Sequence, residues 1–384
     1  MKWYTFLVIM TFSFASTADL PDGWESISGN WDVKKTILSA KTIKESAILM
    51  TDTPTYDFTL ELEFRGDSDA KGAVHLRSHW LPTEGDLTSN RLYGYRIDLH
   101  PGNKEVTASV HETYSGQRLV IPSPDAQKVL KVDDWNTLQI IAEGEVISVW
   151  INGVKANHVH DEAFIGGRVA LEIEEGSSLE FRNGTLSARE RKGAWRALFN
   201  GTSTDGWKVY GSERFDVEDG TIIGRSGPEK SEGYLLTDDS WTDFRVRGTF
   251  KMLGAGNYGL FYRSHIVLRE KDGYPLIAGV QGEVDPAYPG PSGWHYESYR
   301  RGWIHEPPQG ESMRAYAAPP DTWGQIEIRC VGNRTTSWIN GIRIVDFYDE
   351  NPQVFEGGFA LQLHAGGADG IQWKDLYVLE SSSH

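Results

Sequence analysis

The segment Ser337-Trp338-Ile339-Asn340-Gly341-Ile342-Arg343-Ile344 contains two apolar runs that flank an Asn-Gly pair. Asn-Gly supplies the positive φ angles that a type I′ hairpin turn requires, so the segment predicts two antiparallel strands. Ile151-Asn152-Gly153-Val154 repeats the pattern, and residues 59–64 alternate polar and apolar side chains as a half-buried strand does. Many short strands with turn signals and no long 3.6-residue period predict an all-β chain of antiparallel sandwiches, in which helix is scarce.

The two Asn-Gly hairpins belong to a longer internal repeat. Its other matched landmarks are Gly23-Trp24 with Gly206-Trp207, Asp57-Phe58 with Asp243-Phe244, Arg77-Ser78-His79 with Arg263-Ser264-His265, Trp135-Asn136 with Trp323-Gly324, and Gly166-Gly167 with Gly357-Gly358. Their near-constant spacing indicates a duplicated domain, and each copy is long enough for a core of its own. We predict one domain over residues 19–188, a charged linker over 189–195 and a second domain over 196–381.

The composition agrees with this fold class and narrows the partners. Of the 384 residues, 12% are aromatic and 41 are Gly, a mix that favours strands and tight turns. The hydrophobic fraction of 39% is sufficient for packed cores. The formal net charge of −16 argues against nucleic acid and anionic membranes as partners. A neutral partner such as a glycan stays open, as does the oligomeric state.

The first 18 residues are typical of a signal peptide. Lys2 precedes an apolar stretch that ends near Phe14, and Ala15-Ser16-Thr17-Ala18 offers small residues to signal peptidase. We therefore expect export to the periplasm or the extracellular space, with cleavage after Ala18 and no membrane attachment afterwards; the alternative is a buried N-terminal strand. Cys330 is the single cysteine, so no internal disulfide can form, and its strand-like context predicts a buried, inert thiol.

Alternating polar side chains mark one strand of the second copy as a candidate site. In the run from Val280 to Asp285, the strand period places Gln281, Glu283 and Asp285 on one face. Repulsion between the two carboxylates raises the pKa of at least one of them, which is useful for general acid–base catalysis. The alternative is an ordinary solvated face.

Other segments of the second copy add polar and aromatic groups. Gln362 and His364 alternate with inward Leu361 and Leu363, and Arg263 shares its parity with His265. The Pro- and Gly-containing segment 289–303 predicts a loop folded over this polar platform. Aromatic rings stack on sugars, while Arg and carboxylate side chains bind sugar hydroxyls. We expect these contacts from five side chains of the loop: Tyr296, Glu297, Arg300, Arg301 and Trp303.

The second copy also carries an ordered set of longer motifs. They are Leu198-Phe199-Asn200-Gly201, Asp205-Gly206-Trp207, Gly256-Asn257-Tyr258-Gly259-Leu260-Phe261-Tyr262-Arg263-Ser264, residues 279–286, Ser292-Gly293, Tyr296-Glu297, Arg300-Arg301-Gly302-Trp303 and Ala360-Leu361-Gln362-Leu363-His364. This set, which spans residues 195–380, resembles the 3-keto-disaccharide hydrolase family. The resemblance implies a concanavalin A-like jelly roll in each of two tandem copies, export, and action on glycosides oxidised at the 3-position. Val280 and Gly282 depart from the family pattern, which puts the substrate fit in doubt.

The first copy resembles the family more faintly. Aligning residues 94–101 with residues 279–286 puts Arg96 at Gln281, Asp98 at Glu283 and His100 at Asp285, while Glu174 falls at His364. These replacements favour a scaffold or accessory binding domain over a second active site.

A 3-keto sugar suggests a mechanism, because its carbonyl acidifies the hydrogen on C2. Removal of that proton, β-elimination of the C1 substituent and addition of water need a base, an enolate stabiliser and an acid. We expect His364 as the base, Arg263 or Arg301 as the stabiliser, Glu283 or Glu297 as the acid, and Asp285 to orient His364 or bind hydroxyls. The expected substrate-binding residues are Gln281, Arg263, Tyr296, Arg300, Arg301, Trp303 and Gln362.

Two other functions fit the same residues. Glu283 and Asp285 can be the carboxylate pair of a conventional glycoside hydrolase, although side-by-side residues on one strand do not flank a bond. A carbohydrate-binding module without turnover is the non-enzymatic alternative. We predict no cofactor and commit to no metal, because the spacing matches no tight motif, although His364, Glu283 and Asp285 are competent ligands and a divalent ion such as calcium stays open.

Overall fold

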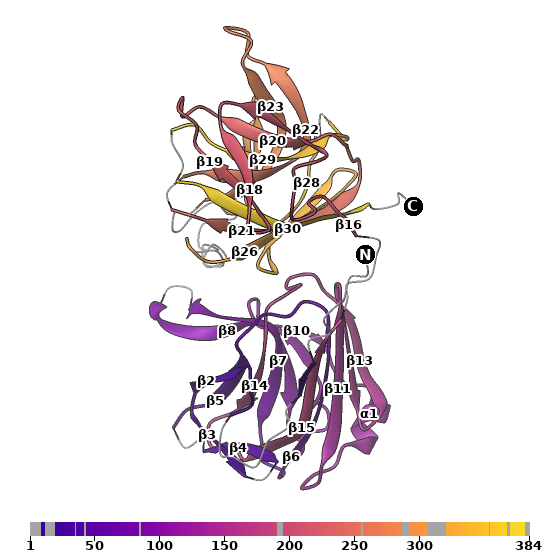
Figure 1. Ribbon diagram of the computed structural model, residues 1–384. Helices are drawn as coiled ribbons and strands as arrows, with labels where there is room; N and C mark the ends of the chain where they lie inside the picture. The colour runs from indigo at the N-terminus through magenta and orange to yellow at the C-terminus, as the bar shows by residue number, and fades with distance from the viewer. Residues whose placement is uncertain are drawn as a thin grey trace. The chain divides into compact units, whose positions relative to one another are not determined.

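The computed structural model describes residues 9–11, 20–34, 36–41, 44–83, 86–189, 195–254, 256–285, 292–305, 320–352, 354–366 and 369–380. The chain divides into two compact units, Met1–Lys192 and Gly193–His384. Each unit is a sandwich of two antiparallel sheets (Figure 1). Most of the predicted signal peptide and linker lies outside the described residues.

The first unit contains two sheets and a short helix. In spatial order, the strands of one sheet are β13 (Val154–His160), β12 (Val146–Ile151), β11 (Asn136–Glu143), β6 (Phe58–Gly66), β15 (Leu179–Ala188), β4 (Ile37–Lys41) and β3 (Asn30–Lys34), with β1 (Ile9–Thr11) beside β15. Those of the other sheet are β10 (Gln117–Val120), β9 (Val110–Glu112), β8 (Asp86–Leu99), β7 (Gly72–Thr83), β14 (Arg168–Ile173), β5 (Ala47–Thr51) and β2 (Trp24–Ser28). Helix α1 (Pro124–Val129) begins at Ser123, whose hydroxyl accepts a hydrogen bond from the Ala126 amide.

The second unit repeats this plan. One sheet consists of β18 (Arg214–Glu218), β19 (Thr221–Arg225), β30 (Ile371–Glu380), β21 (Phe244–Met252), β26 (Gly324–Val331), β27 (Arg334–Ile339) and β28 (Ile342–Tyr348), with β16 (Arg196–Ala197) beside β30. The other, which we call the site sheet, consists of β17 (Trp207–Gly211), β20 (Gly233–Thr237), β29 (Gly358–Leu363), β22 (Tyr258–Leu268), β23 (Pro275–Val284), β24 (His295–Ser298) and β25 (Gly302–His305).

Strand alternation produces the cores, as the sequence predicts. On β6 the buried side chains are Phe58, Leu60, Leu62 and Phe64, whereas Glu61 between them is exposed. Burying one apolar face of each sheet against its partner is the main stabilising term of such a sandwich. The predicted all-β class and the two tandem concanavalin A-like sandwiches are therefore confirmed.

Both predicted Asn-Gly hairpins form. The φ angles are 49° and 78° at Asn152 and Gly153, and 49° and 86° at Asn340 and Gly341. These positive pairs connect β12 to β13 and β27 to β28 as type I′ turns do. Cys330 is fully buried on β26, as predicted.

One element prediction is wrong. The segment 289–303 was expected to be a loop, but its described part contains strands β24 and β25, which extend the site sheet at its edge. The register pairs Gln281 of β23 with Tyr296 of β24, and Tyr296 with Trp303 of β25. Aromatic residues fit a pleated, half-buried surface well, and this preference outweighs the nearby Gly and Pro signals.

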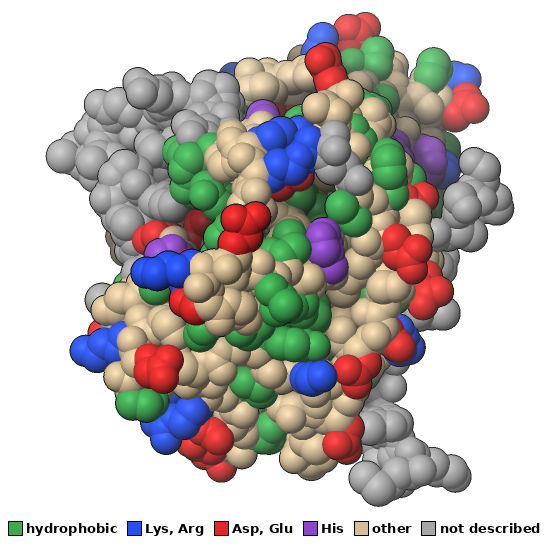
Figure 2. All heavy atoms as spheres, turned by 90° about the horizontal axis from the view of Figure 1, so that it is seen from above, with side chains coloured by type: hydrophobic (Ala, Val, Ile, Leu, Met, Phe, Trp, Pro, Cys, Tyr) green, Lys and Arg blue, Asp and Glu red, His purple; other side chains and the backbone are tan. Residues whose placement is uncertain are grey.

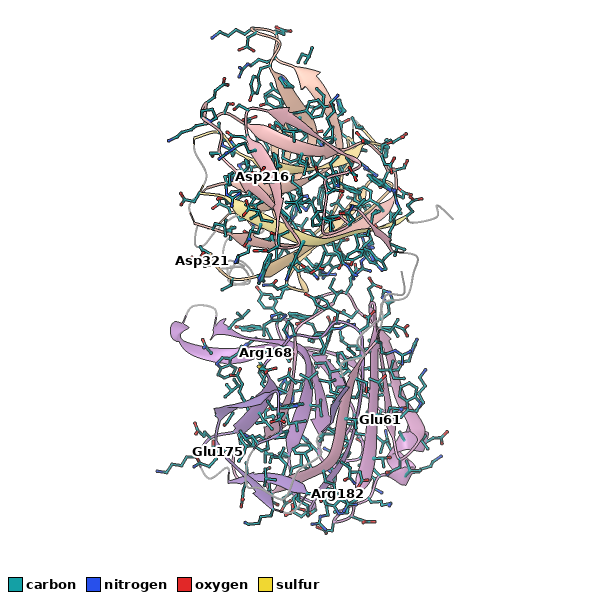
Figure 3. The ribbon with its side chains drawn as sticks, in the orientation of Figure 1. Glu61, Arg168, Glu175, Arg182, Asp216 and Asp321 are labelled. Atoms are coloured by element: carbon teal, nitrogen blue, oxygen red, sulfur yellow. The ribbon has the colours of Figure 1, made fainter. Side chains whose placement is uncertain are left out.

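The surface of the protein mixes acidic and basic side chains and does not gather one sign of charge in a block. Acidic and basic side chains alternate with apolar ones over the face shown in Figure 2. In the first unit, Glu61 on β6 and Arg182 on β15 both lie on the solvent side of their sheet (Figure 3). No helix of the described residues is long and apolar enough to span a membrane.

Candidate functional site

The outer face of the site sheet holds the predicted polar residues. Gly282 points inward, because a Cβ added there would lie 2.6 Å from Ile328 of the opposite sheet. Its neighbours Gln281 and Glu283 therefore point outward. Gly259 of β22 pairs with Glu283 of β23 on one side and with Gln362 of β29 on the other. Glu283, Gly259 and Gln362 thus form one row across three strands.

Two further rows flank this one. On one side, Gln281 pairs with Tyr296, which pairs with Trp303. On the other side, the His364 amide donates to the carbonyl of Asn257 (3.1 Å), so His364 and Asn257 are neighbours. The three rows define a surface that we call the polar face: Asn257, Gly259, Gln281, Glu283, Asp285, Tyr296, Trp303, Gln362 and His364.

Asn257 links the two carboxylates of the polar face. Its side-chain amide donates to Glu283 Oε1 (2.5 Å) and to Asp285 Oδ2 (3.2 Å). Burial and, to a lesser extent, the charge of Asp285 raise the pKa of Glu283, the hydrogen bond from Asn257 opposes both, and the resulting pKa is about 8. Glu283 is therefore a neutral carboxylic acid at pH 7 and can donate a proton.

His364 has an exposed ring at the end of β29. Its side chain is 50% exposed, and Nδ1 lies 2.9 Å from the Ala365 carbonyl. A carbonyl oxygen can only accept, so Nδ1 carries the proton and Nε2 is the basic nitrogen of the neutral ring. The polar face therefore carries both a base and an acid, on two strands that β22 separates.

Gly259 and Gln362 form the floor between these groups. A Cβ added at Gly259 would lie 2.5 Å from the side chain of Gln281, so glycine is what allows the buried Gln281 side chain to lie over this strand. Gln362 is 4% exposed, and its Oε1 has no hydrogen-bond partner among the described residues. A buried amide oxygen without a partner is costly, and a ligand hydroxyl can satisfy it.

Aromatic side chains lie on the same face, toward the β25 edge of the sheet. Trp303 is 43% exposed, and its ring contacts those of Tyr296 and Trp294 at centroid distances of 5.2 and 5.8 Å. Such an exposed indole is suited to stacking on the apolar face of a sugar ring.

Arg263 is not on the polar face, contrary to its expected role. It occupies a β-bulge with φ 51° and is 5% exposed. Its guanidinium donates to the carbonyls of Thr242 (3.1 Å) and Gly332 (2.7 Å) and lies 3.8 Å from Asp243. Arg77 does the same in the first unit, with the carbonyls of Tyr56 and Phe164, which indicates a structural role in both copies.

Glu297 and its arginine partners also lie elsewhere. Glu297 pairs with Val280, and Val280 pairs with inward-facing Tyr262, so Glu297 points to the side opposite Gln281. It binds Arg300 (2.9 Å) and Arg301, and Arg301 forms a two-pronged ion pair with Asp349. These side chains line a separate cavity of about 340 Å³. The structure thus places neither the expected second acid nor either expected arginine beside Glu283.

Two residues of this region carry contacts that sequence reasoning did not assign. Asn257 stands two positions before Gly259 in the motif Gly256-Asn257-Tyr258-Gly259, so the strand period was a signal for it. Glu232, at the start of β20, lies with Oε1 4.0 Å from His364 Nε2. No local pattern marks Glu232, because its proximity to His364 comes from pairing between β20 and β29.

The corresponding face of the first unit is filled by its own ion pairs. Arg96 donates to Asp98 (2.8 Å), to Glu172 and to Glu174 (2.5 Å). His75 binds Glu172 and His111 binds Asp98, both at 2.8 Å. Burial raises the pKa of Glu172, but the hydrogen bonds and charges of His75 and Arg96 outweigh it and lower the value to about 2. The carboxylates of this face are thus paired with internal cations.

The described residues contain no group of three His, Cys, Asp or Glu side chains arranged to hold a metal ion.

Comparisons with solved structures give several distant matches. A candidate glycosyl hydrolase from Parabacteroides distasonis is 18% identical over 49% of this chain and 94% of its own, with a TM-score of 0.36. The carbohydrate-binding module CBM66 from Bacillus subtilis is 18% identical over 43% and 96%, with a TM-score of 0.34. The VIP36 exoplasmic/lumenal domain, in a form bound to Ca²⁺ and Man3GlcNAc, is 10% identical over 48% and 88%, with a TM-score of 0.34. No curated protein matches the sequence.

A family model gives the decisive comparison. The model described as a 3-keto-alpha-glucoside-1,2-lyase-like domain matches residues 14–187 and again residues 194–379. The two matches correspond to the two repeats and to the two sandwiches. The chain therefore belongs, through both of its copies, to the 3-keto-alpha-glucoside-1,2-lyase-like domain family.

Proposed function

We propose that the polar face of the second unit cleaves 3-keto-glycosides. One observation carries this proposal: a carboxyl group with a pKa of about 8, Glu283, shares a sheet face with the exposed imidazole of His364. An acid that is protonated at pH 7 and an imidazole base are two of the three groups that the reaction needs.

The reaction would proceed in balanced steps. His364 Nε2 takes the proton from C2, and the C–H electron pair moves toward the C3 carbonyl to form an enolate. The enolate electrons then form the C1–C2 double bond, the bond from C1 to the leaving oxygen breaks, and Glu283 protonates that oxygen. Addition of water across the double bond restores the C2 hydrogen and places a hydroxyl on C1.

The remaining groups of the polar face would position the sugar. The Gln362 amide can present its oxygen or, after rotation, its NH₂ group to a substrate oxygen, and the latter supplies the enolate stabilisation that Arg263 and Arg301 were expected to provide. Trp303 offers a stacking surface for the sugar ring.

A turnover assay tests the proposal. With a p-nitrophenyl 3-keto-glucoside, we expect His364→Ala and Glu283→Gln each to lower kcat by about 10²- to 10⁴-fold, the usual contribution of a general acid or base. His265→Ala is the matched control, because His265 is exposed on the same strand as Gly259 but outside the polar face. Full activity in both variants, or no turnover by the wild type, would exclude this mechanism.

Sugar binding without cleavage is the second candidate, favoured by the exposed Trp303. Calorimetry would then show saturable binding of a glycan that Trp303→Ala weakens, while chromatography detects no product.

We also propose that the chain is exported. Mass spectrometry of the mature protein would then find Asp19 as the first residue, and an N-terminus that retains residues 1–18 would contradict export.

A further inference from the structure

Three segments hold the carboxylate of Glu232 in place. Glu232 Oε2 accepts hydrogen bonds from the hydroxyls of Tyr234 (2.5 Å) and Tyr299 (2.7 Å), and its main-chain carbonyl accepts one from Tyr274 (2.8 Å). Tyr234 lies on β20, Tyr299 in the turn between β24 and β25, and Tyr274 at the tip of the β22–β23 hairpin. The Glu232 side chain is 22% exposed, so its second oxygen is fixed near solvent.

That second oxygen faces the imidazole of His364. Gly233 pairs with Leu363, so Glu232 lies beside His364 at the same end of two neighbouring strands. The distance from Glu232 Oε1 to His364 Nε2 is 4.0 Å. On the other side of the ring, Nδ1 donates to the Ala365 carbonyl at 2.9 Å. The Ala365 carbonyl thus keeps the proton of the neutral ring on Nδ1, and the Glu232 carboxylate lies near Nε2, where it stabilises a proton that this nitrogen takes up.

We propose that Glu232 is the positioning residue for His364: it orients the imidazole and stabilises the ring after Nε2 has taken a proton. The catalytic meaning of this pairing rests on the proposed function, whereas the pairing itself does not. Asp285, the residue expected to orient His364, is separated from it by Asn257, which places the two backbones about 10 Å apart at ordinary strand spacing.

The other titratable groups near His364 are engaged by partners of their own, so Glu232 is the carboxylate that faces the ring. Burial and the Glu232 charge raise the pKa of both Tyr234 and Tyr299, so the two phenols stay neutral donors. Arg269 is engaged by Asp272 through two contacts of 2.8 and 2.7 Å. Lys230 contributes its main-chain carbonyl, which accepts from the Gly366 amide (3.0 Å).

An NMR titration of the His364 ring in the full chain tests the pairing without substrate. The signal is assigned by its loss in His364→Ala. Because a nearby anion favours the imidazolium, we expect Glu232→Gln to weaken proton binding at His364 by about threefold or more, a modest effect since the ring is half exposed. Glu356→Gln removes the same charge at the far end of β29, roughly 25 Å along the strand, and should leave the titration unchanged.

Kinetics then connect the pairing to turnover. The acidic limb of the kcat/KM profile should move to lower pH in Glu232→Gln. Tyr299→Phe keeps the negative charge of Glu232 but removes one of the two hydroxyls that bind its carboxylate, so it should lower kcat with little change in KM. The inference is overturned if His364 titrates in Glu232→Gln and in Tyr299→Phe as it does in the control variant Glu356→Gln. If instead the His364 titration shifts in Glu232→Gln but neither the wild type nor any variant acts on a 3-keto-glucoside, the pairing of Glu232 with His364 stands and the proposed function fails.

Discussion

Glu283 and Asp285 show how two similar side chains acquire different chemistry. Glu283 is 3% exposed on the strand, whereas Asp285 follows the strand end and is partly exposed. Removing a carboxylate from water disfavours its charged form, so the buried member of the pair keeps its proton. Asn257 contacts both, and its bond to Glu283 opposes but does not outweigh burial.

The first prediction concerns pH. Because the pKa of folded Glu283 is about 8, above its ordinary 4.5, the folded state binds a proton that the unfolded state releases between these values. Unfolding free energy should therefore fall by ~3–5 kcal/mol between pH 4.5 and 8 from this group. Urea unfolding of Glu283→Gln should lack that slope, and wild-type turnover should decline above pH 8. Parallel pH profiles of the two proteins would contradict the assignment.

The second prediction concerns the floor of the polar face. In Gly259→Ala the new methyl group meets the Gln281 side chain, which must leave its buried position. We expect KM for a 3-keto-glucoside to rise about tenfold or more because an expected substrate-binding side chain is displaced, while the crowding lowers stability by about 1–3 kcal/mol. Unchanged KM in a correctly folded variant would place the sugar elsewhere.

The third prediction concerns Glu172 of the first unit. Its folded pKa of about 2 lies below the ordinary 4.5, so its ion pairs stabilise the fold above pH 4.5 and are lost as the pH falls toward 2. Glu172→Gln should destabilise the unit by ~2–4 kcal/mol at pH 7 and by much less near pH 2. Denaturant titrations at both pH values measure the difference, and a constant one would contradict the pairing.

At the scale of elements, a β-bulge that occurs in both units removes an arginine from the outer face of the sheet and gives it a structural role. The register of β22 shifts between Tyr262 and His265, and that of β7 shifts between Leu76 and His79. The bulge turns Arg263 and Arg77 away from the strand alternation and buries their guanidinium groups. Counting by twos along the sequence therefore assigns Arg263 to the wrong surface.

The fourth prediction tests this role. Arg263→Met leaves the carbonyls of Thr242 and Gly332 without their buried donor and Asp243 without its cation, so we expect a loss of ~3–5 kcal/mol. Arg214→Met, on the exposed side of β18, should cost less than ~0.5 kcal/mol. Chemical unfolding compares the two, and equal midpoints would show that the buried arginine is dispensable.

At the scale of the whole molecule, duplication has produced two faces of unlike chemistry. The first unit places Ala73 between Asp98 and Glu172, whereas the second places Gly259 between Glu283 and Gln362. The first face has an arginine that neutralises its carboxylates, whereas no residue in the described part of the second face gives Glu283 such a cation. We infer that turnover belongs to the second unit.

The fifth prediction follows from this asymmetry. In the full chain, Asp98→Asn should leave kcat within about twofold of the wild type, since its effect is confined to the first unit, while Glu283→Gln abolishes most of the turnover. Assays at 20 °C, with folding checked by circular dichroism, separate loss of activity from loss of structure. A large loss of kcat in folded Asp98→Asn would indicate that both faces act.

The all-β class, the duplication, the Asn-Gly turns and the outward orientation of Gln281 and Glu283 could all be predicted from the sequence, because they depend on interactions within a few residues. Which polar groups meet depends on the tertiary contacts. The β20–β29 pairing brings Glu232 to His364, the bulge removes Arg263, and the β24 register turns Glu297 to the other side. Strand partners, bulges and burial are properties of contacts between distant segments, and a local pattern of side chains does not encode them.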